Sequence, residues 1–330
     1  MSNIGLINVA RIRILLYTLV LFLRRRDSRS SHSLILSFSR VVGMASSTAT
    51  TGWDDRELLR RSVVGYGEML AALSRRRRGE EEGVVRVPGR LVGAAFEEQF
   101  VSPWTSAATE LTLDESAIVD LSEVIDEARL PGCIWAVCTI KNRVERPSIL
   151  MPCLAIDLAE FARLEQQRED ASIVVEEDEF EYAVPPFDVI RAMNEQAYGI
   201  VPTPTSIPLI TSPNDDPIIR AHGLRLKDPD AAASRLPASV SPFVCIMFTM
   251  LLDGDLSIQY VATERSFRRR GLASRLLRRV LHDAYHTAGA RTASLQATPD
   301  GLSVYERLGF RRVGALRAFL QQQPRSSSAI

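Results

Sequence analysis

The residue types with the most direct chemical use lie in 268–274, which read Arg268, Arg269, Arg270, Gly271, Leu272, Ala273 and Ser274. The residues that follow predict that a helix begins here. The first backbone N–H groups of a helix have no intrahelical partner, and the helix dipole adds roughly half a positive charge at that end. Such an end binds phosphate or pyrophosphate, and Gly271 lets the backbone approach the anion because it has no Cβ. Arginines add charge-assisted hydrogen bonds, so the segment predicts a phosphate site.

Two predicted elements must position this segment. Residues 256–262 alternate in hydrophobicity, as expected for a strand. From Ala273 to Ala288, apolar residues recur at the i, i+3, i+4 and i+7 spacing of one helix face, and Gly289 follows where a C-cap is expected. A basic turn before an amphipathic helix is more often a solvated surface than a ligand site, so the segment needs support from elsewhere in the chain.

Further support comes from the residues downstream. Residues 291–297 alternate as a second strand, and after a turn the pattern of residues 302–308 predicts a short helix. Tyr305 lies on the apolar side of this helix. Packing as a core aromatic residue would explain Tyr305 without any catalytic role.

Three segments, in this order and spacing, resemble the GNAT (Gcn5-related N-acetyltransferase) superfamily. They are Val261-Ala262-Thr263, Arg268-x-x-Gly271-x-Ala273 and Ser303-Val304-Tyr305-Glu306-Arg307-Leu308-Gly309-Phe310. The matching region covers about residues 243–313, roughly a fifth of the chain. The resemblance implies an α/β protein with the acyl-CoA N-acyltransferase fold, in which helices flank a mixed central sheet. It also implies that this sheet splays between residues 256–262 and 291–297 and admits acetyl-CoA.

The resemblance further implies an N-acetyltransferase that moves the acetyl group of acetyl-CoA to a primary amine by direct attack, with no covalent enzyme intermediate. Residues 268–274 would bind the pyrophosphate. Val261, Ala262 and Thr263 would offer backbone groups to the pantetheine arm, although ordinary sheet pairing would also use these groups. Tyr305 would serve as the general acid that protonates the departing thiolate.

The sequence does not identify a general base. Glu264 stands where the family often has an acid of structural role. The other candidates, which would act through water, are Glu177, Asp178 and Glu195. Where the family often carries an asparagine near the last strand and helix, this chain has Gln296, Thr298 and Asp300.

Composition limits the class of protein. The 330 residues include 40 basic and 40 acidic side chains, a balance that argues against a general nucleic-acid binder. The four cysteines form no Cys-x-x-Cys pair and no Cys/His cluster, which predicts buried free thiols and no metal site. The sequence specifies neither the oligomeric state nor the acceptor, which we expect to be a small-molecule amine or a protein or peptide amine.

A rival interpretation is a non-catalytic acyl-CoA-binding or regulatory protein with the same fold. Such a protein would keep the loop at residues 268–273 and lack turnover. Tyr305 argues mildly against it, because a binding protein has no thiolate to protonate.

Residues 1–43 contain a short apolar run, 14–23, with arginines on both sides. The run is too short to span a bilayer, which takes about twenty apolar residues, so we do not expect a membrane protein. Three interpretations stay open, namely a signal peptide, a mitochondrial transit peptide and an extension upstream of Met44. We expect the segment to be dispensable for the fold and the protein to be cytoplasmic, with mitochondria as the alternative.

The expected organisation has five parts. They are an extension at 1–43, a docking helix with a charged linker at 44–83, an α/β region at 84–171, the N-acetyltransferase domain at 172–320 and a disordered tail at 321–330. Region 84–171 contains a predicted helix at 116–129 and a predicted hairpin of strands 133–140 and 149–156, and it could be a degenerate second copy of the fold. Residues 228–241 are predicted to form a loop.

Overall fold

The computed structural model describes residues 52–78, 83–95, 107–124, 132–141, 149–169, 179–197 and 219–320. The described residues from Trp53 onward group into one compact unit. The predictions for the extension at 1–43, for the tail at 321–330 and for Glu177 and Asp178 lie outside the described residues. Among the described residues, no helix is both long enough and apolar enough to cross a membrane.

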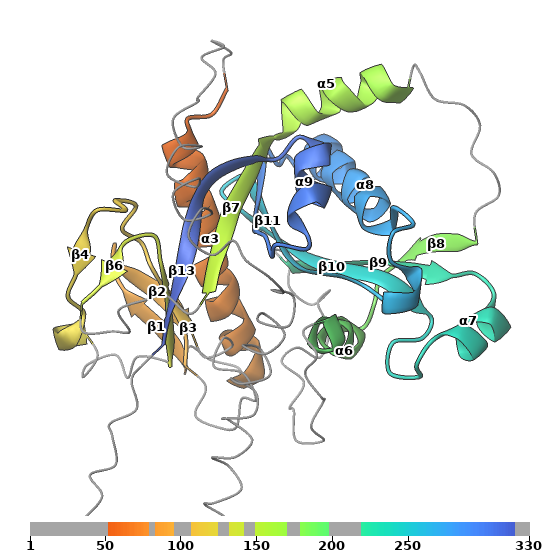
Figure 1. The fold of residues 1–330 in the computed structure, drawn as a ribbon, viewed down its shortest axis with the longest axis horizontal. Coiled ribbons are helices and arrows are strands. Elements are labelled where there is room, and N and C mark those ends of the chain that lie inside the picture. The colour runs from red at the N-terminus through yellow and green to blue at the C-terminus, as the bar shows by residue number, and fades with distance from the viewer. Residues whose placement is uncertain are drawn as a thin grey trace, which may run out of the picture. The chain divides into compact units, whose positions relative to one another are not determined.

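One sheet of eleven strands runs through the described part of the chain (Figure 1), in the order β1-β2-β3-β5-β13-β7-β12-β11-β10-β9-β8. Its strands are β1 Val84–Val87, β2 Leu91–Ala94, β3 Ala107–Glu110, β5 Cys133–Ala136, β7 Ile149–Asp157, β8 Phe180–Ala183, β9 Ile219–Leu226, β10 Phe243–Leu252, β11 Asp255–Thr263, β12 Thr292–Gln296 and β13 Arg311–Leu320. Two short strands, β4 Ile118–Val119 and β6 Thr139–Ile140, form a second sheet. The helices are α3 Asp55–Arg78, α5 Leu158–Glu169, α6 Phe187–Ala197, α7 Pro229–Arg235, the 3-10 helix η2 Arg265–Phe267, α8 Leu272–Thr287 and α9 Leu302–Leu308.

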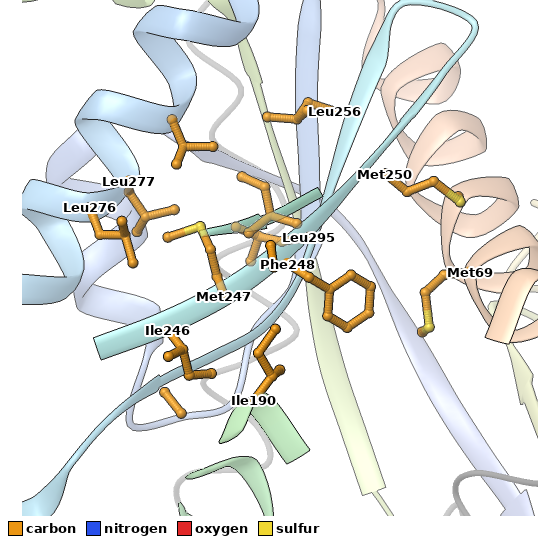
Figure 2. Packing of buried hydrophobic residues seen from close by; sticks show 14 of the residues in the cluster. Met69, Ile190, Ile246, Met247, Phe248, Met250, Leu256, Leu276, Leu277 and Leu295 are labelled. Atoms are coloured by element: carbon orange, nitrogen blue, oxygen red, sulfur yellow. The ribbon is translucent and has the colours of Figure 1, made fainter. Parts of the chain in front are cut away.

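Successive residues of β10 point to opposite faces of the sheet, and different helices cover the two faces. Figure 2 shows Met247 directed toward Leu276 and Leu277 of α8, whereas the next residue, Phe248, is directed toward Met69 of α3. All five side chains are buried. The face under α8 and the face under α3 are therefore separate surfaces of one sheet.

Helix α3 is the docking helix predicted from the sequence, and one face of it is buried through Leu59, Val63, Tyr66, Leu70 and Leu73. Asp54 caps it, because its carboxylate accepts a hydrogen bond from the N–H of Arg56 at 3.2 Å. Two glycines let the sheet and the helix approach closely. A Cβ on Gly67 would lie 2.3 Å from Cγ1 of Val92, and a Cβ on Gly314 would lie 2.7 Å from a methyl group of Leu59.

Strands from both sides of the predicted boundary between residues 171 and 172 share the large sheet. Strand β7 lies between β12 and β13 and pairs antiparallel with both. Helix α3 packs against β2, β3, β7, β11, β12 and β13. The regions 84–171 and 172–320 therefore contribute to a single sheet with a common helix across it.

Three local predictions were wrong. Strands β5 and β7 do not form a hairpin, because β13 lies between them and pairs with both. Within the predicted helix at 116–129, residues 118–119 form β4, and described helical backbone is confined to 122–124. The predicted loop at 228–241 contains α7, whose N-cap Asp228 accepts a hydrogen bond from the N–H of Asp230.

The second of these differences has a local cause. The carboxylate of Asp114 accepts hydrogen bonds from the backbone N–H and hydroxyl of Ser116, at 2.9 and 2.7 Å. The carboxylate of Asp120 bonds Ser122 in the same way, at 2.9 and 2.6 Å. Such turns satisfy backbone groups locally and compete with a helix.

His222 makes the stability of the fold depend on pH. Its Nε2 lies 2.9 Å from the hydroxyl of Thr249, and burial, together with Arg220, lowers its pKa from 6.5 to about 4. The folded state therefore binds a proton less readily than the unfolded chain, so this stabilisation is complete above pH 6.5 and is lost as the pH falls toward 4. We expect a loss of about 3 kcal/mol in the free energy of unfolding across this window.

Urea unfolding of the wild type and of His222→Gln at pH 7 and pH 4.5 measures this contribution. The variant should lose less stability than the wild type between the two pH values, because glutamine does not titrate. Equal losses in the two proteins would show that His222 does not supply this pH dependence.

Gly67 tests how closely α3 packs on the sheet. In an exposed helix, Gly→Ala stabilises by about 1 kcal/mol, but here the new Cβ would also lie 3.0 Å from the carbonyl oxygen of Val92. We expect Gly67→Ala to lower the free energy of unfolding by about 1–3 kcal/mol, the usual cost of overpacking. In the double variant Gly67→Ala/Val92→Ala, part of this loss should be recovered relative to Val92→Ala alone. A stabilised single variant would contradict the packing described.

Candidate functional site

The large sheet opens between β11 and β12. These strands pair in parallel over Asp255–Ser257 and Thr292–Ser294. Beyond Ser257, β11 continues along β10, and beyond Ser294, β12 continues along β7. We call the opening between residues 258–263 and 295–297 the fork. It lies where the sequence predicted that the sheet splays, and Figure 1 shows the two parts of the sheet diverging.

A β-bulge interrupts β11 beside the fork. Ile246 pairs with Ala262 and Phe248 with Gln259, so Tyr260 and Val261 together oppose Met247. Tyr260 has φ 55°, in the left-handed region, which is unusual for a non-glycine residue. A bulge leaves an extra residue unpaired and bends its strand.

The predicted backbone contacts Val261, Ala262 and Thr263 follow this bulge. In the described residues no strand pairs with the fork side of β11 beyond Ser257. Thr263 is held in place because its hydroxyl donates to the Cys245 thiol at 3.3 Å, and Ala262 is buried. The fork edge of β11 therefore offers backbone N–H and C=O groups to an extended ligand.

Short-range hydrogen bonds fix the loop that leads from β11 to α8. Glu264 caps η2, because its carboxylate accepts a hydrogen bond from the N–H of Ser266 at 2.6 Å. Arg268 Nε donates to the carbonyl oxygen of Thr263 at 3.0 Å. Arg269 has φ 65° and completes the turn. Glu264 thus has the structural part that the sequence suggested for it.

The N-terminus of α8 has no side-chain cap. Gly271 is the N-cap residue, and the first N–H bonded within the helix is that of Arg275, at 2.9 Å from the carbonyl oxygen of Gly271. The N–H groups of residues 271–274 have no intrahelical acceptor. These N–H groups are those of Gly271, Leu272, Ala273 and Ser274, which the sequence predicted to bind the pyrophosphate.

Gly271 meets two requirements at this helix end. An added Cβ would have no atom within 4 Å, so the described residues leave the approach to the backbone open, as the sequence analysis expected. The φ of Gly271 is 75°, a conformation that residues with side chains rarely adopt. A β-branched residue here would both obstruct an anion and strain the backbone.

The three arginines of the loop differ in their contacts. Arg270 Nη1 lies 3.2 Å from a carboxylate oxygen of Glu179, and its guanidinium lies 4.8 Å from the ring centre of Phe267. Arg268 and Arg269 are exposed and form no ion pair with a described residue. The charge available to a phosphate is therefore concentrated on Arg268 and Arg269, whereas Arg270 ties the loop to the residue before β8.

Tyr305 lies on α9, one turn beyond β12. It is 8% exposed, and its ring meets Phe310 edge to face with the centroids 6.0 Å apart. A Cβ on Gly301 would lie 3.1 Å from this ring. Gly309 ends the helix with φ 100°. The ring is packed in the core, and this packing is compatible both with a core aromatic residue and with a positioned acid.

Sequence analysis missed a polar layer on the α3 face at the closed end of the fork. The hydroxyl of Thr292 and the hydroxyl of Ser294 each donate to one carboxylate oxygen of Asp255, at 2.6 Å in both cases. Burial raises the pKa of Asp255. The layer is formed by Ser62, Asp255, Ser257, Gln259, Thr292, Ser294 and Gln296. Its signal was a polar residue at every second position in both strands.

Of the remaining candidates for a base, Glu195 is the one that lies among the described residues. Glu195 pairs with Arg191 on α6 at 3.3 Å. No group of three or more His, Cys, Asp or Glu side chains that could hold a metal ion occurs among the described residues. All four cysteines are buried free thiols, as predicted.

Residues 248–319 match the family described as acetyltransferase (GNAT) domain. No curated protein matches this chain. A similar solved structure is a GCN5-related N-acetyltransferase from Kribbella flavida, 18% identical, with 84% of this chain and 99% of that chain covered and a TM-score of 0.46. A GCN5-related N-acetyltransferase-like protein from Streptococcus suis is 11% identical, with 81% and 98% covered and a TM-score of 0.41.

Glucosamine-6-phosphate N-acetyltransferase from Arabidopsis thaliana is 12% identical, with 46% of this chain and 99% of that chain covered and a TM-score of 0.29. The family match begins within β10 and ends within β13, so it includes the bulge, the loop at residues 268–271 and the fork. The match to the acetyltransferase (GNAT) domain therefore covers the elements that form the candidate site.

Proposed function

We propose that this protein is an N-acetyltransferase that transfers the acetyl group of acetyl-CoA to a primary amine by direct attack. The observation that carries the proposal is the adjacency of two unsatisfied sets of backbone groups. One set lies on the fork edge of β11, and the other lies at the uncapped N-terminus of α8. The nine-residue strand β11 and a short loop join them, so one elongated ligand can reach both.

Acetyl-CoA has the chemistry that these two sets require. Its pyrophosphate would accept hydrogen bonds from the N–H groups of residues 271–274, with Arg268 and Arg269 neutralising charge. The amides of its pantetheine arm would pair with the backbone of residues 261–263, as an added strand does. A backbone N–H in this stretch would also polarise the thioester carbonyl.

The reaction then needs few groups from the protein. The amine nitrogen attacks the thioester carbonyl, a C–N bond forms and the C–S bond breaks. The nitrogen releases one proton to solvent water, and Tyr305 supplies one to the sulfur and recovers its own from solvent. Holding both substrates together supplies much of the acceleration through proximity.

An acceptor screen on the full chain tests the proposal. Thiol release from acetyl-CoA is followed with small-molecule amines and with peptides that carry a free N-terminus or a lysine. We expect release that depends on one class of amine. Tight acetyl-CoA binding with no release for any amine would favour the rival interpretation, a non-catalytic acyl-CoA-binding protein.

Replacement of Gly271 tests the anion site. Gly271→Val should weaken acetyl-CoA binding by at least tenfold in calorimetry, because the side chain blocks the backbone N–H groups and strains the turn. Gly289→Val is the matched control. Gly289 follows the other end of α8, has φ 71° and is equally open, so it carries the same strain without a ligand. Equal affinities in the wild type and Gly271→Val would remove the loop from the site.

Tyr305→Phe tests the proposed acid. The substitution keeps the ring and its contact with Phe310 but removes the proton. Turnover should fall by about a hundredfold, which corresponds to about 3 kcal/mol of barrier. Affinity for acetyl-CoA should hardly change, and Tyr285→Phe on α8 should leave the rate unaltered. A Tyr305→Phe rate within twofold of the wild type, with chemistry rate-limiting, would assign Tyr305 to the core alone.

A further inference from the structure

Two glutamine side chains meet across the fork. Gln259 of β11 and Gln296 of β12 follow the last paired residues on the same face, the face covered by α3. Their backbones have already separated, yet Gln259 Nε2 lies 3.3 Å from Gln296 Oε1. They are therefore the first side chains that an acyl group entering the fork would meet on this face.

The hydrogen bonds fix how both carboxamides are oriented. Gln296 Nε2 lies 3.1 Å from the backbone carbonyl oxygen of Ser62 and 2.8 Å from its hydroxyl. A carbonyl oxygen can only accept, so the group of Gln296 that faces α3 must be the NH₂. Gln296 Oε1 consequently faces Gln259, and Gln259 must present its own NH₂.

This NH₂ has both of its protons engaged. Gln259 Nε2 donates to the hydroxyl of Ser257 at 3.0 Å and to Gln296 Oε1 at 3.3 Å. The oxygen of the same carboxamide, Oε1, receives no hydrogen bond from a described residue. Gln259 is only 6% exposed, but Oε1 is not a fully buried atom. A partly accessible acceptor of fixed direction is thus left at the fork.

We propose that Gln259 is a positioning residue for the acceptor, whose amine N–H donates to Gln259 Oε1. This inference rests on the proposed function. Acetyl-CoA would reach the fork from the α8 end, so the amine would approach the thioester from the α3 face, where Gln259 lies. The hydrogen bond would turn the nitrogen lone pair toward the thioester carbonyl.

The chemistry of a carboxamide also selects the form of the amine. A carboxylate at this place would stabilise the ammonium ion, which has no lone pair for attack. A neutral oxygen accepts the N–H of the uncharged amine and raises the pKa of that amine less than a carboxylate would. The only carboxylate in the polar layer, Asp255, lies at the closed end, where two hydroxyls hold it.

Helix α3 is part of this arrangement, although it lies outside the segment that matches the family. Ser62 is fully buried and fixes Gln296, which in turn fixes Gln259. Ser62→Ala removes one of the two acceptors for Gln296 and leaves the backbone carbonyl. Its effect should therefore be in the same direction as that of a Gln259 variant, but smaller.

Steady-state kinetics of the full chain test the assignment, with the amine that the wild type uses best in the screen. Gln259→Leu should lower kcat/KM for the amine by about tenfold, the size expected for one hydrogen bond, and leave the Kd of acetyl-CoA within twofold. Gln167→Leu, a substitution of an exposed glutamine on α5, is the matched control. Gln259→Met decides the matter if the leucine variant does not fold.

Gln259→Glu changes the kcat–pH profile only if Gln259 contacts the amine, so this variant separates a positioning role from a purely structural one. Its carboxylate should raise the pKa of the bound amine, so the rising limb of the kcat–pH profile should shift upward by about one unit. An amine kcat/KM within twofold of the wild type in a folded Gln259→Leu or Gln259→Met protein overturns the positioning role and leaves the acetyltransferase proposal standing. Absence of thiol release from the wild type with every amine overturns both.

Discussion

The parallel ladder between β11 and β12 ends after Ser257 and Ser294, and the contacts proposed for the pantetheine arm and for the amine depend on that ending. The two strands can separate because each keeps an outer neighbour, β10 for β11 and β7 for β12. Their inner backbone groups are left for another partner, since polar groups withdrawn from water must be paired. The bulge at Tyr260 bends β11 at the same place.

Segments distant in the sequence hold this opening. Strand β7 supports the β12 side, and α3 packs on strands from both sides of the fork. Close contact of α3 with β11 is possible because Gly65 has no side chain, and a Cβ there would lie 3.1 Å from the hydroxyl of Ser257. The Arg61 guanidinium also donates to the carbonyl oxygen of Asp253 in the β10–β11 turn at 2.9 Å. Helix α3 and strand β7, from the first half of the chain, thus support the two strands that border the fork.

Charge is unevenly distributed along the fork. The open side has the N-terminus of α8 with Arg268 and Arg269, which favours phosphate. At the closed side, burial raises the pKa of Asp255, while two hydroxyls and the charge of Arg61 stabilise its carboxylate. The other side chains of the polar layer are neutral hydroxyls and carboxamides. A ligand with an anionic end and a neutral reactive end matches this gradient. The same gradient makes a neutral glutamine a suitable neighbour for an uncharged amine.

The sequence by itself determined the features that neighbouring residues decide. The alternation of residues 256–262, the apolar stripe of α8, and Gly289 just after its end depend on contacts within a few positions, so pattern and spacing were enough to predict them. Only the tertiary structure decided that β13 lies between β5 and β7, that Glu179 engages Arg270, and that Ser62 orients Gln296. The partners in these contacts are separated by long stretches of chain, and their pairing follows from how helices and strands pack rather than from any local pattern.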